Sequence, residues 1–168
     1  MLNLAGEIKN SLTNGPGLRY VIFTQGCSHS PHCKGCHNIH TWSNEPNLLI
    51  SIDDMFKNIE KELPLIKGVT FSGGEPFDQA KELFELAIKC KSLHLNVLCY
   101  TGYTYEELQQ ISLLRSMEAT YIRRLLESVD ILIDGKFEID NQENHGLYRG
   151  SKNQRMIYLD KGKIIKIE

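Results

Sequence analysis

Short apolar segments typical of β-strands alternate with amphipathic segments typical of helices, and this alternation constrains the fold more than any other feature of the chain. Strands are predicted at 18–25, 66–71, 95–100 and 129–134, helices at 52–63, 78–93, 105–115 and 118–127, and a terminal β-hairpin at 154–168. Ser51 and Thr104 are expected to cap two of the helices, and the hairpin turn is expected at 160–162. Strands joined through helices pair in parallel, so the pattern predicts an α/β fold with a mostly parallel sheet, in one domain over residues 1–168.

The composition narrows the classes of protein to which the chain can belong. The 168 residues carry a formal net charge of -2, which gives no basic surface for nucleic acid. No apolar run approaches the ~18 residues that a membrane span needs, and the N-terminus lacks the basic start and long apolar stretch of a signal peptide. We therefore expect a cytoplasmic protein that binds neither nucleic acid nor a membrane.

Four unusual segments follow the four predicted parallel strands. A cysteine-rich segment follows the first strand, SGGEP (72–76) the second, TGY (101–103) the third and DGKF (134–137) the fourth. Right-handed crossovers bring the carboxyl ends of parallel strands to one edge of the sheet, where ligands bind in such folds. All four segments are therefore expected at one edge, which is the predicted site.

The segment QGCSHSPHCKGCHN holds three of the five cysteines, Cys27, Cys33 and Cys36, within ten residues. A tight cluster in a chain of this kind indicates a metal site rather than a disulfide scaffold. A structural zinc site needs four protein ligands, so a histidine would have to join the three thiolates. A [4Fe–4S] cluster normally takes four cysteines, so three leave one iron open. The segment alone leaves both alternatives open. Cys90 and Cys99 lie in apolar surroundings and are expected to be buried.

The Gly-Gly-Glu sequence favours the iron–sulfur alternative. Gly73 and Gly74 at a strand end let a ligand approach the backbone closely, and Glu75 offers a carboxylate to an ammonium group. A tight strand-to-helix turn is the plain structural explanation of the same residues. A turn alone explains less well why SGGEP is predicted at the same edge of the sheet as a cluster with one open iron.

Six segments of the sequence resemble one family, in that family's order. They are NGPGLRY, GC…CKGCHN…TW, VTFSGGEP, YTGYTYEEL, VDILIDGKF and YRGSKNQ, and they run from Asn14 to Gln154. In these segments the chain resembles the radical S-adenosylmethionine (SAM) superfamily and, more closely, the activating proteins of anaerobic ribonucleotide reductase, which are glycyl-radical-enzyme activases. The resemblance implies a partial (βα) barrel, a [4Fe–4S] cluster and SAM as cofactors, and reductive cleavage of SAM that installs a glycyl radical on the reductase.

The resemblance also implies which residues form the site. Cys27, Cys33 and Cys36 are the implied ligands of three irons, and no catalytic residue is implied beyond the cluster and SAM. The implied contacts to SAM are Gly35, Cys36, His37, Gly73, Gly74, Glu75, Thr101, Gly102, Asp134 and Lys136. Asp134 and Lys136 are equally well explained as an ion pair on the rim that touches no ligand.

The cysteine loop departs from the family pattern. Five residues separate Cys27 from Cys33, whereas the family spacing is Cys-x3-Cys-x2-Cys, so two extra residues lengthen the loop. We expect His29 and His32, which lie within it, to face solvent. The role of Tyr148–Gln154 is left open.

The resemblance implies the reductase as protein substrate, an external one-electron donor such as flavodoxin or ferredoxin, and a homodimer. Two other functions stay open: an activase of another glycyl-radical enzyme, such as pyruvate formate-lyase, and a non-enzymatic zinc-binding module. The zinc module needs a fourth ligand from His32, His37 or His40. It leaves SGGEP and TGY without a role.

Overall fold

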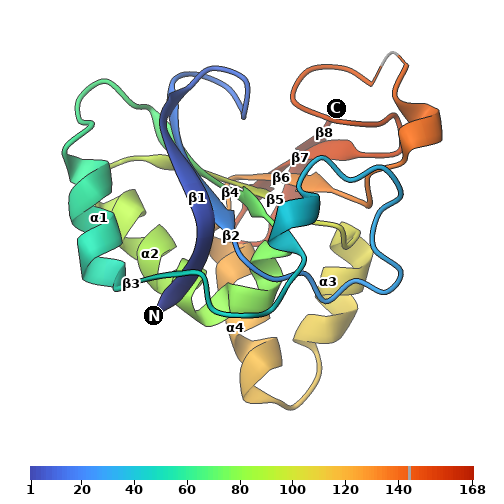
Figure 1. Cartoon of the computed structure of the whole chain (residues 1–168), viewed down its shortest axis with the longest axis horizontal. Helices are drawn as coiled ribbons and strands as arrows, with labels where there is room; N and C mark the ends of the chain where they lie inside the picture. The colour runs from blue at the N-terminus through green and yellow to red at the C-terminus, as the bar shows by residue number, and fades with distance from the viewer. Residues whose placement is uncertain (144) are drawn as a thin grey trace.

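A computed structural model describes residues 1–143 and 145–168 of the chain. An eight-stranded sheet in the order β3-β1-β2-β4-β5-β6-β7-β8 runs through the middle of the molecule (Figure 1). The strands are β1 (Leu2–Ser11), β2 (Arg19–Thr24), β3 (Leu48–Ile50), β4 (Gly68–Gly73), β5 (Asn96–Tyr100), β6 (Ile131–Asp134), β7 (Arg155–Asp160) and β8 (Lys163–Ile167).

Four parallel strands form the middle of the sheet. β2, β4, β5 and β6 pair in parallel, with registers such as Val21 opposite Thr70 and Leu98 opposite Ile131. Each connection between them contains at least one helix, which is the right length of chain for a parallel crossover. The predicted α/β fold and its parallel strands are confirmed, and the terminal hairpin turns between Asp160 and Lys163, as expected.

Antiparallel strands extend the sheet on both sides. β1 pairs with β2 and with the short β3, while β7 pairs with β6 and β8. The sequence pattern did not reveal β1, because only its first residues, Leu2 and Leu4, are buried apolar side chains and residues 7–10 are exposed. The sheet is therefore parallel at its centre and antiparallel towards both edges.

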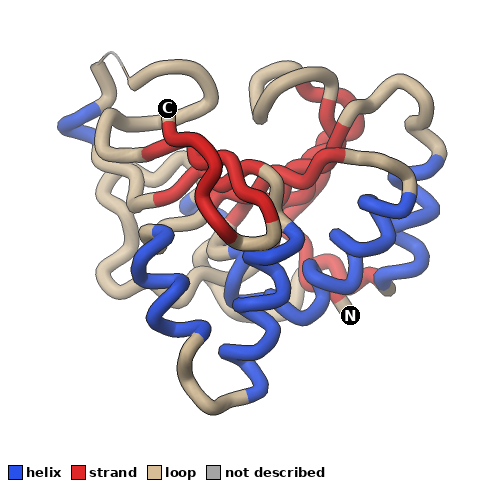
Figure 2. The backbone as a smooth tube through the Cα atoms, turned by 180° about the vertical axis from the view of Figure 1, so that it is seen from behind, coloured by secondary structure: helices blue, strands red, loops and turns tan. Residues whose placement is uncertain are grey.

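Four helices gather on one side of the sheet (Figure 2). They are α1 (Ile52–Glu60), α2 (Ala80–Ser92), α3 (Tyr105–Ser112) and α4 (Met117–Ser128). Both predicted caps are confirmed: Asp54 N donates to Ser51 Oγ at 3.1 Å, and Thr104 forms a reciprocal capping box with Glu107. Among the residues that the structure describes, no helix is long and apolar enough to cross a membrane.

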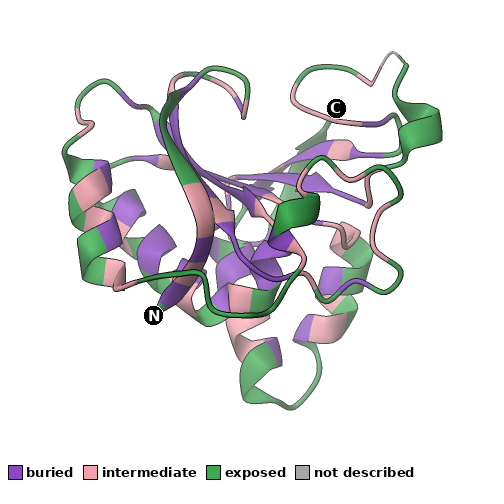
Figure 3. Cartoon of the chain, in the orientation of Figure 1, coloured by how far each residue is buried: buried purple, intermediate pink, exposed green. Residues whose placement is uncertain are grey.

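Alternate residues of each strand face the two sides of the sheet. The main core lies on the helix side and includes Tyr20, Ile22, Val69, Phe71, Val97, Cys99 and Leu132. A smaller cluster, built on Leu98, Ile131, Ile133 and Met156, lies on the opposite face. Burial is concentrated in the strands and the helix faces against them (Figure 3). Cys90 and Cys99 are fully buried, as predicted, and burial raises the pKa of the Cys90 thiol to about 12.

A buried arginine joins the β1–β2 loop to the parallel strands. Arg19 is 1% exposed, and its guanidinium donates to Thr70 Oγ1 at 2.7 Å, Val69 O at 2.6 Å, Pro16 O at 3.1 Å, and both Asn96 O and Asn96 Oδ1 at 3.0 Å. All of these acceptors are neutral. Burial lowers the pKa of Arg19 to about 10, so the group still carries its charge at neutral pH.

Two glycines make room for this arginine. A Cβ on Gly68 would lie 2.7 Å from both terminal nitrogens of Arg19, and a Cβ on Gly15 would lie 2.8 Å from its Cδ. Thr70, which accepts from Arg19, donates in turn to Asn14 O at 2.8 Å. The segment NGPGLRY therefore forms one structural unit, because its arginine fixes the loop that its asparagine and glycines form.

We expect Arg19→Met to lower the free energy of unfolding by about 3 kcal/mol, because it leaves several buried carbonyl groups without a donor. Urea denaturation followed by circular dichroism measures this change. Arg123→Met, at an exposed position of α4, is the matched control and should change the free energy by no more than about 0.5 kcal/mol. Equal effects of the two substitutions would contradict a structural role for the Arg19 network.

Candidate functional site

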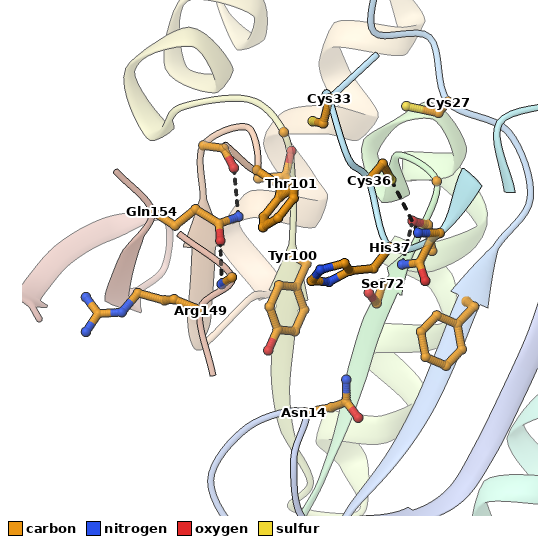
Figure 4. Close-up of a pocket in the computed structure, with 18 of the residues that line it drawn as sticks. Asn14, Cys27, Cys33, Cys36, His37, Ser72, Tyr100, Thr101, Arg149 and Gln154 are labelled. Carbon is orange, nitrogen blue, oxygen red and sulfur yellow. Dashed lines mark hydrogen bonds between the residues drawn. The ribbon is translucent and has the colours of Figure 1, made fainter. Parts of the chain in front are cut away.

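A cavity of about 690 Å³ lies on the face of the sheet opposite the helices. Phe23, Ser72 and Tyr100, which face away from the main core, form its floor. In Figure 4 the cysteines lie at one end of the cavity and Asn14 at the other. The cavity therefore runs along the sheet from the carboxyl ends of the parallel strands towards the β1–β2 loop.

The cysteine loop begins where β2 ends. Gly26 N donates to Thr41 O at 2.7 Å and Cys27 N to Trp42 O at 3.3 Å, so the start and the end of the loop are joined. Cys27, Cys33 and Cys36 are free thiols, each partly exposed, and all three line the cavity. The structure thus brings together the three predicted metal ligands.

Burial changes the acidity of two of these thiols. It raises the pKa of Cys27 to about 11 and also raises the pKa of Cys33. Both thiols are therefore protonated at neutral pH in the metal-free chain. Because metals bind thiolates rather than thiols, binding of a metal by these residues would release the protons.

The donor set in the cavity fits an iron–sulfur cluster. Three cysteine thiols line this one cavity, and cysteine thiolates are the usual ligands of such clusters. In the described residues no group of three or more His, Cys, Asp or Glu side chains is arranged to hold a single metal ion.

The histidines proposed for zinc have other neighbours. His32 Nε2 lies 3.1 Å from Cys27 O, and the His32 ring stacks on Trp42 at 4.1 Å between centroids. His37 packs against Phe137 at 4.6 Å and lines the cavity, while His40 is exposed. The expectation that His32 faces solvent is therefore only partly met, because its half-buried ring packs on an aromatic side chain.

His29 is also misplaced by the sequence prediction. It is 9% exposed, and its Nε2 lies 2.7 Å from Oε2 of Glu75. The side chain turns inward because a fully buried carboxylate provides an acceptor there. The position of His29 in a polar loop had suggested that it faces solvent, and no feature of the local sequence indicated a buried partner.

Glu75 lies behind the cavity wall rather than in the cavity. It is 0% exposed, and its carboxylate accepts from Phe77 N at 3.0 Å, Thr101 Oγ1 at 2.8 Å and Gly102 N at 2.9 Å in addition to its contact with His29. All four partners belong to the protein, so the structure does not place this side chain where a direct contact with SAM was expected.

The two preceding glycines allow close packing between β4 and the cysteine loop. Gly73 has a φ of 111°, and a Cβ there would collide with the backbone of Thr24. A Cβ on Gly74 would collide with Gly26 O, and Gly74 N donates to Thr24 O at 2.9 Å. Both glycines line the cavity, so the close packing also leaves bare backbone facing it.

Asp134 and Lys136 do not pair with each other, and neither lines the cavity. Asp134 is 1% exposed, accepts from Tyr105 N at 2.7 Å, and pairs with Arg155, whose Nε donates at 3.0 Å. Asp134 and Glu106 raise the pKa of Arg155. Lys136 Nζ instead donates to Pro31 O at 3.2 Å. Asp134 thus has a partner far along the chain, which the sequence alone could not reveal.

Of the remaining predicted residues, Thr101 and Gly102 line the cavity and Gly35 does not. Gly35 is exposed with a φ of 75°, and a Cβ there would lie 2.5 Å from Ile139 Cδ1. Position 35 therefore needs a glycine for the turn between Cys33 and Cys36. The expected contact from Gly35 to SAM is not supported by this position.

The segment Tyr148–Gln154, left without a role, forms the wall opposite the β1–β2 loop. Tyr100 Oη donates to Tyr148 O at 2.7 Å. Gln154 Oε1 accepts from Gly150 N at 2.8 Å, and Gln154 Nε2 donates to Gly135 O at 2.9 Å. The motif is evident in the sequence, but its neighbours are not, and no signal in the sequence placed Asn14 and Tyr100 in the lining.

Comparisons with known proteins agree with this geometry. The family described as 4Fe-4S single cluster domain matches residues 13–157. The chain is 33% identical over 149 residues to the anaerobic ribonucleoside-triphosphate reductase-activating protein of Enterobacteria phage T4, and the aligned region covers 85% of each chain. It is 34% identical over 151 residues to the protein of that name from Vibrio cholerae (85% of this chain, 89% of the relative) and 30% identical over 161 residues to that of Pasteurella multocida (91% and 95%).

The matched region contains the whole cysteine loop and every strand that surrounds the cavity except β1, and the three relatives share one name. The chain therefore carries a 4Fe-4S single cluster domain and belongs to the family of anaerobic ribonucleoside-triphosphate reductase-activating proteins.

Proposed function

We propose that this chain activates an anaerobic ribonucleoside-triphosphate reductase by installing a glycyl radical on it, with a [4Fe–4S] cluster and SAM as cofactors. One observation carries the proposal: three free thiols in the family's cluster segment open into the same cavity as the bare backbone of Gly73 and Gly74. The names of the relatives support the reductase as the protein substrate.

The residues of this chain hold and orient the cofactors. Cys27, Cys33 and Cys36 are the proposed cluster ligands. When bound, the cluster supplies the electron that cleaves SAM reductively, and the protein supplies orientation and exclusion of water. The electron comes from an external one-electron donor such as flavodoxin or ferredoxin.

SAM is proposed to lie against the strand ends next to the cysteines. His37, Gly73, Gly74, Thr101 and Gly102 line this part of the cavity, so they are the proposed contacts. Glu75 and Asp134 act from behind the wall, because protein donors already surround their carboxylates.

The open side of the cavity suits a protein substrate. The β1–β2 loop and the loop before β7 both rise at the top of Figure 1, where they stand apart from each other. The first contributes Thr13 and Asn14 to the cavity, and the second contributes Tyr148, Arg149 and Gly150. We propose that a glycine-bearing segment of the reductase enters between these loops.

Anaerobic reconstitution with iron and sulfide, followed by reduction with dithionite in the presence of SAM, tests this function. The expected product is 5′-deoxyadenosine, and addition of an anaerobic reductase should give the EPR signal of a glycyl radical. Pyruvate formate-lyase in place of the reductase should give no such signal. A fully loaded cluster that forms no 5′-deoxyadenosine would overturn the proposal, and a radical on the lyase alone would reassign the partner.

We expect Cys27→Ala, Cys33→Ala and Cys36→Ala each to abolish SAM cleavage, because each removes a proposed ligand of one iron. Iron and sulfide analysis of the reconstituted protein, together with the 5′-deoxyadenosine yield, provides the measurement. Cys90→Ala is the matched control, since this buried cysteine lies on α2 and outside the cavity, and it should keep the full complement of iron. A cysteine variant of the loop that keeps both iron and activity would remove that residue from the ligand set.

We expect Gly74→Ala to destabilise the protein by about 1–3 kcal/mol and to lower its iron content, because the added methyl group collides with Gly26 O in the cysteine loop. Urea denaturation and iron analysis measure the two effects. Gly6→Ala in β1 is the control, because a Cβ at Gly6 meets no atom within 4 Å. If Gly74→Ala behaves like Gly6→Ala, the close packing between β4 and the loop is not needed for the site.

A further inference from the structure

The cysteine loop is exposed over much of its length, but between Cys27 and Cys36 it has one buried side chain. His29 is 9% exposed, while its neighbours Ser28 and Ser30 are exposed. Its Nε2 lies 2.7 Å from Oε2 of Glu75, the shortest of the four contacts to that carboxylate. The loop therefore reaches into the protein at a point two residues after Cys27.

The surroundings of His29 are built to receive an imidazole ring. The ring of Tyr103 packs on it at 4.4 Å between centroids. Gly102 provides the space, because a Cβ there would lie 2.5 Å from His29 Nε2, and Gly102 N donates to the same carboxylate oxygen at 2.9 Å. The segment after β5 thus holds the ring from one side while Glu75 holds it from another.

The neighbouring residue adds a second attachment to the segment that follows β4. Ser28 N donates to Asp78 Oδ2 at 2.8 Å, and Ser28 Oγ donates to Asp78 Oδ1 at 2.6 Å. These bonds are exposed to solvent, where hydrogen bonds contribute less than in the interior. Of the two side-chain attachments at Ser28 and His29, the contact between His29 and Glu75 is the buried one, so it is the stronger.

We propose that His29 is a positioning residue for the iron–sulfur cluster, because its contact with Glu75 holds Cys27 in a loop that has five residues before the next ligand. The inference rests on the proposed cluster at Cys27, Cys33 and Cys36. Partners that orient a metal ligand from outside the coordination shell typically change metal retention by about 10–100-fold when removed. His29 is such a partner, acting through the backbone that it shares with Cys27.

Four variants test this role. His29→Leu fills the same space with an apolar side chain and loses the contact with Glu75. His29→Asn has a side chain too short to reach Glu75. His29→Gln retains a donor at the end of a longer side chain and should restore the contact. Ile59→Val removes one buried methylene group from α1 in the main core, away from the cysteine loop and the cavity, so it controls for loss of stability alone.

The measurement is the rate at which reconstituted protein loses its cluster to an iron chelator without oxygen, followed by visible absorbance. EPR of the reduced cluster in the absence of SAM and the thermal midpoint of the metal-free protein are recorded for the same variants. We expect His29→Leu and His29→Asn to lose the cluster about 10-fold faster than the parent chain and to change the EPR spectrum. His29→Gln should restore most of the retention, and Ile59→Val should change the rate less than about 2-fold.

Two results would overturn the inference. One is retention and an EPR spectrum of His29→Leu or His29→Asn equal to those of the parent chain. The other is cluster loss from the His29 variants that is faster only in proportion to their lower thermal midpoint, as in Ile59→Val, which would mean that the contact contributes only to general stability. Neither result depends on SAM cleavage or on the reductase, whereas failure of the parent chain to hold a cluster would instead overturn the proposed function.

Discussion

The carboxylate of Glu75 joins three of the segments that form the site. A charge removed from water is tolerated only when it is surrounded by donors, because its desolvation costs several kcal/mol. Here the donors are His29 from the cysteine loop, Phe77 from its own segment, and Thr101 and Gly102 from the end of β5. None of these segments can move away without leaving the carboxylate buried and short of a partner, so the relative positions of cysteines and strand ends depend on it.

The position of the cavity follows from the layered arrangement of the fold. All four helices pack on one face of the sheet, and the other face carries the loops that enclose the cavity. Arg19 fixes one wall through its bonds across three strands, and Gln154 fixes the other through the backbone of Gly135 and Gly150. Each wall is thus held by one buried or half-buried polar side chain that satisfies backbone groups from separate segments.

Elements defined by local chemistry were predictable, and those defined by distant partners were not. The caps at Ser51 and Thr104 were predictable because a cap needs only residues within three positions. Asp134 was not, because its partner Arg155 comes from a strand whose register no local pattern reveals. β1 was not predicted, because much of it is exposed and it lacks the apolar alternation by which a strand is recognised.

By itself the sequence determined the alternation of strands and helices, the convergence of four segments on one edge, and the three cysteines with their missing fourth ligand. These features depend on residue type and spacing, which are local properties of the chain. Only the tertiary structure decided what each polar side chain does. Glu75, which the motif suggested as a contact to the ligand, is buried among protein donors, and His29, which the loop suggested as a surface residue, is one of them. The physical reason is that burial and hydrogen-bond partners belong to the folded arrangement, and neighbouring residues do not encode them.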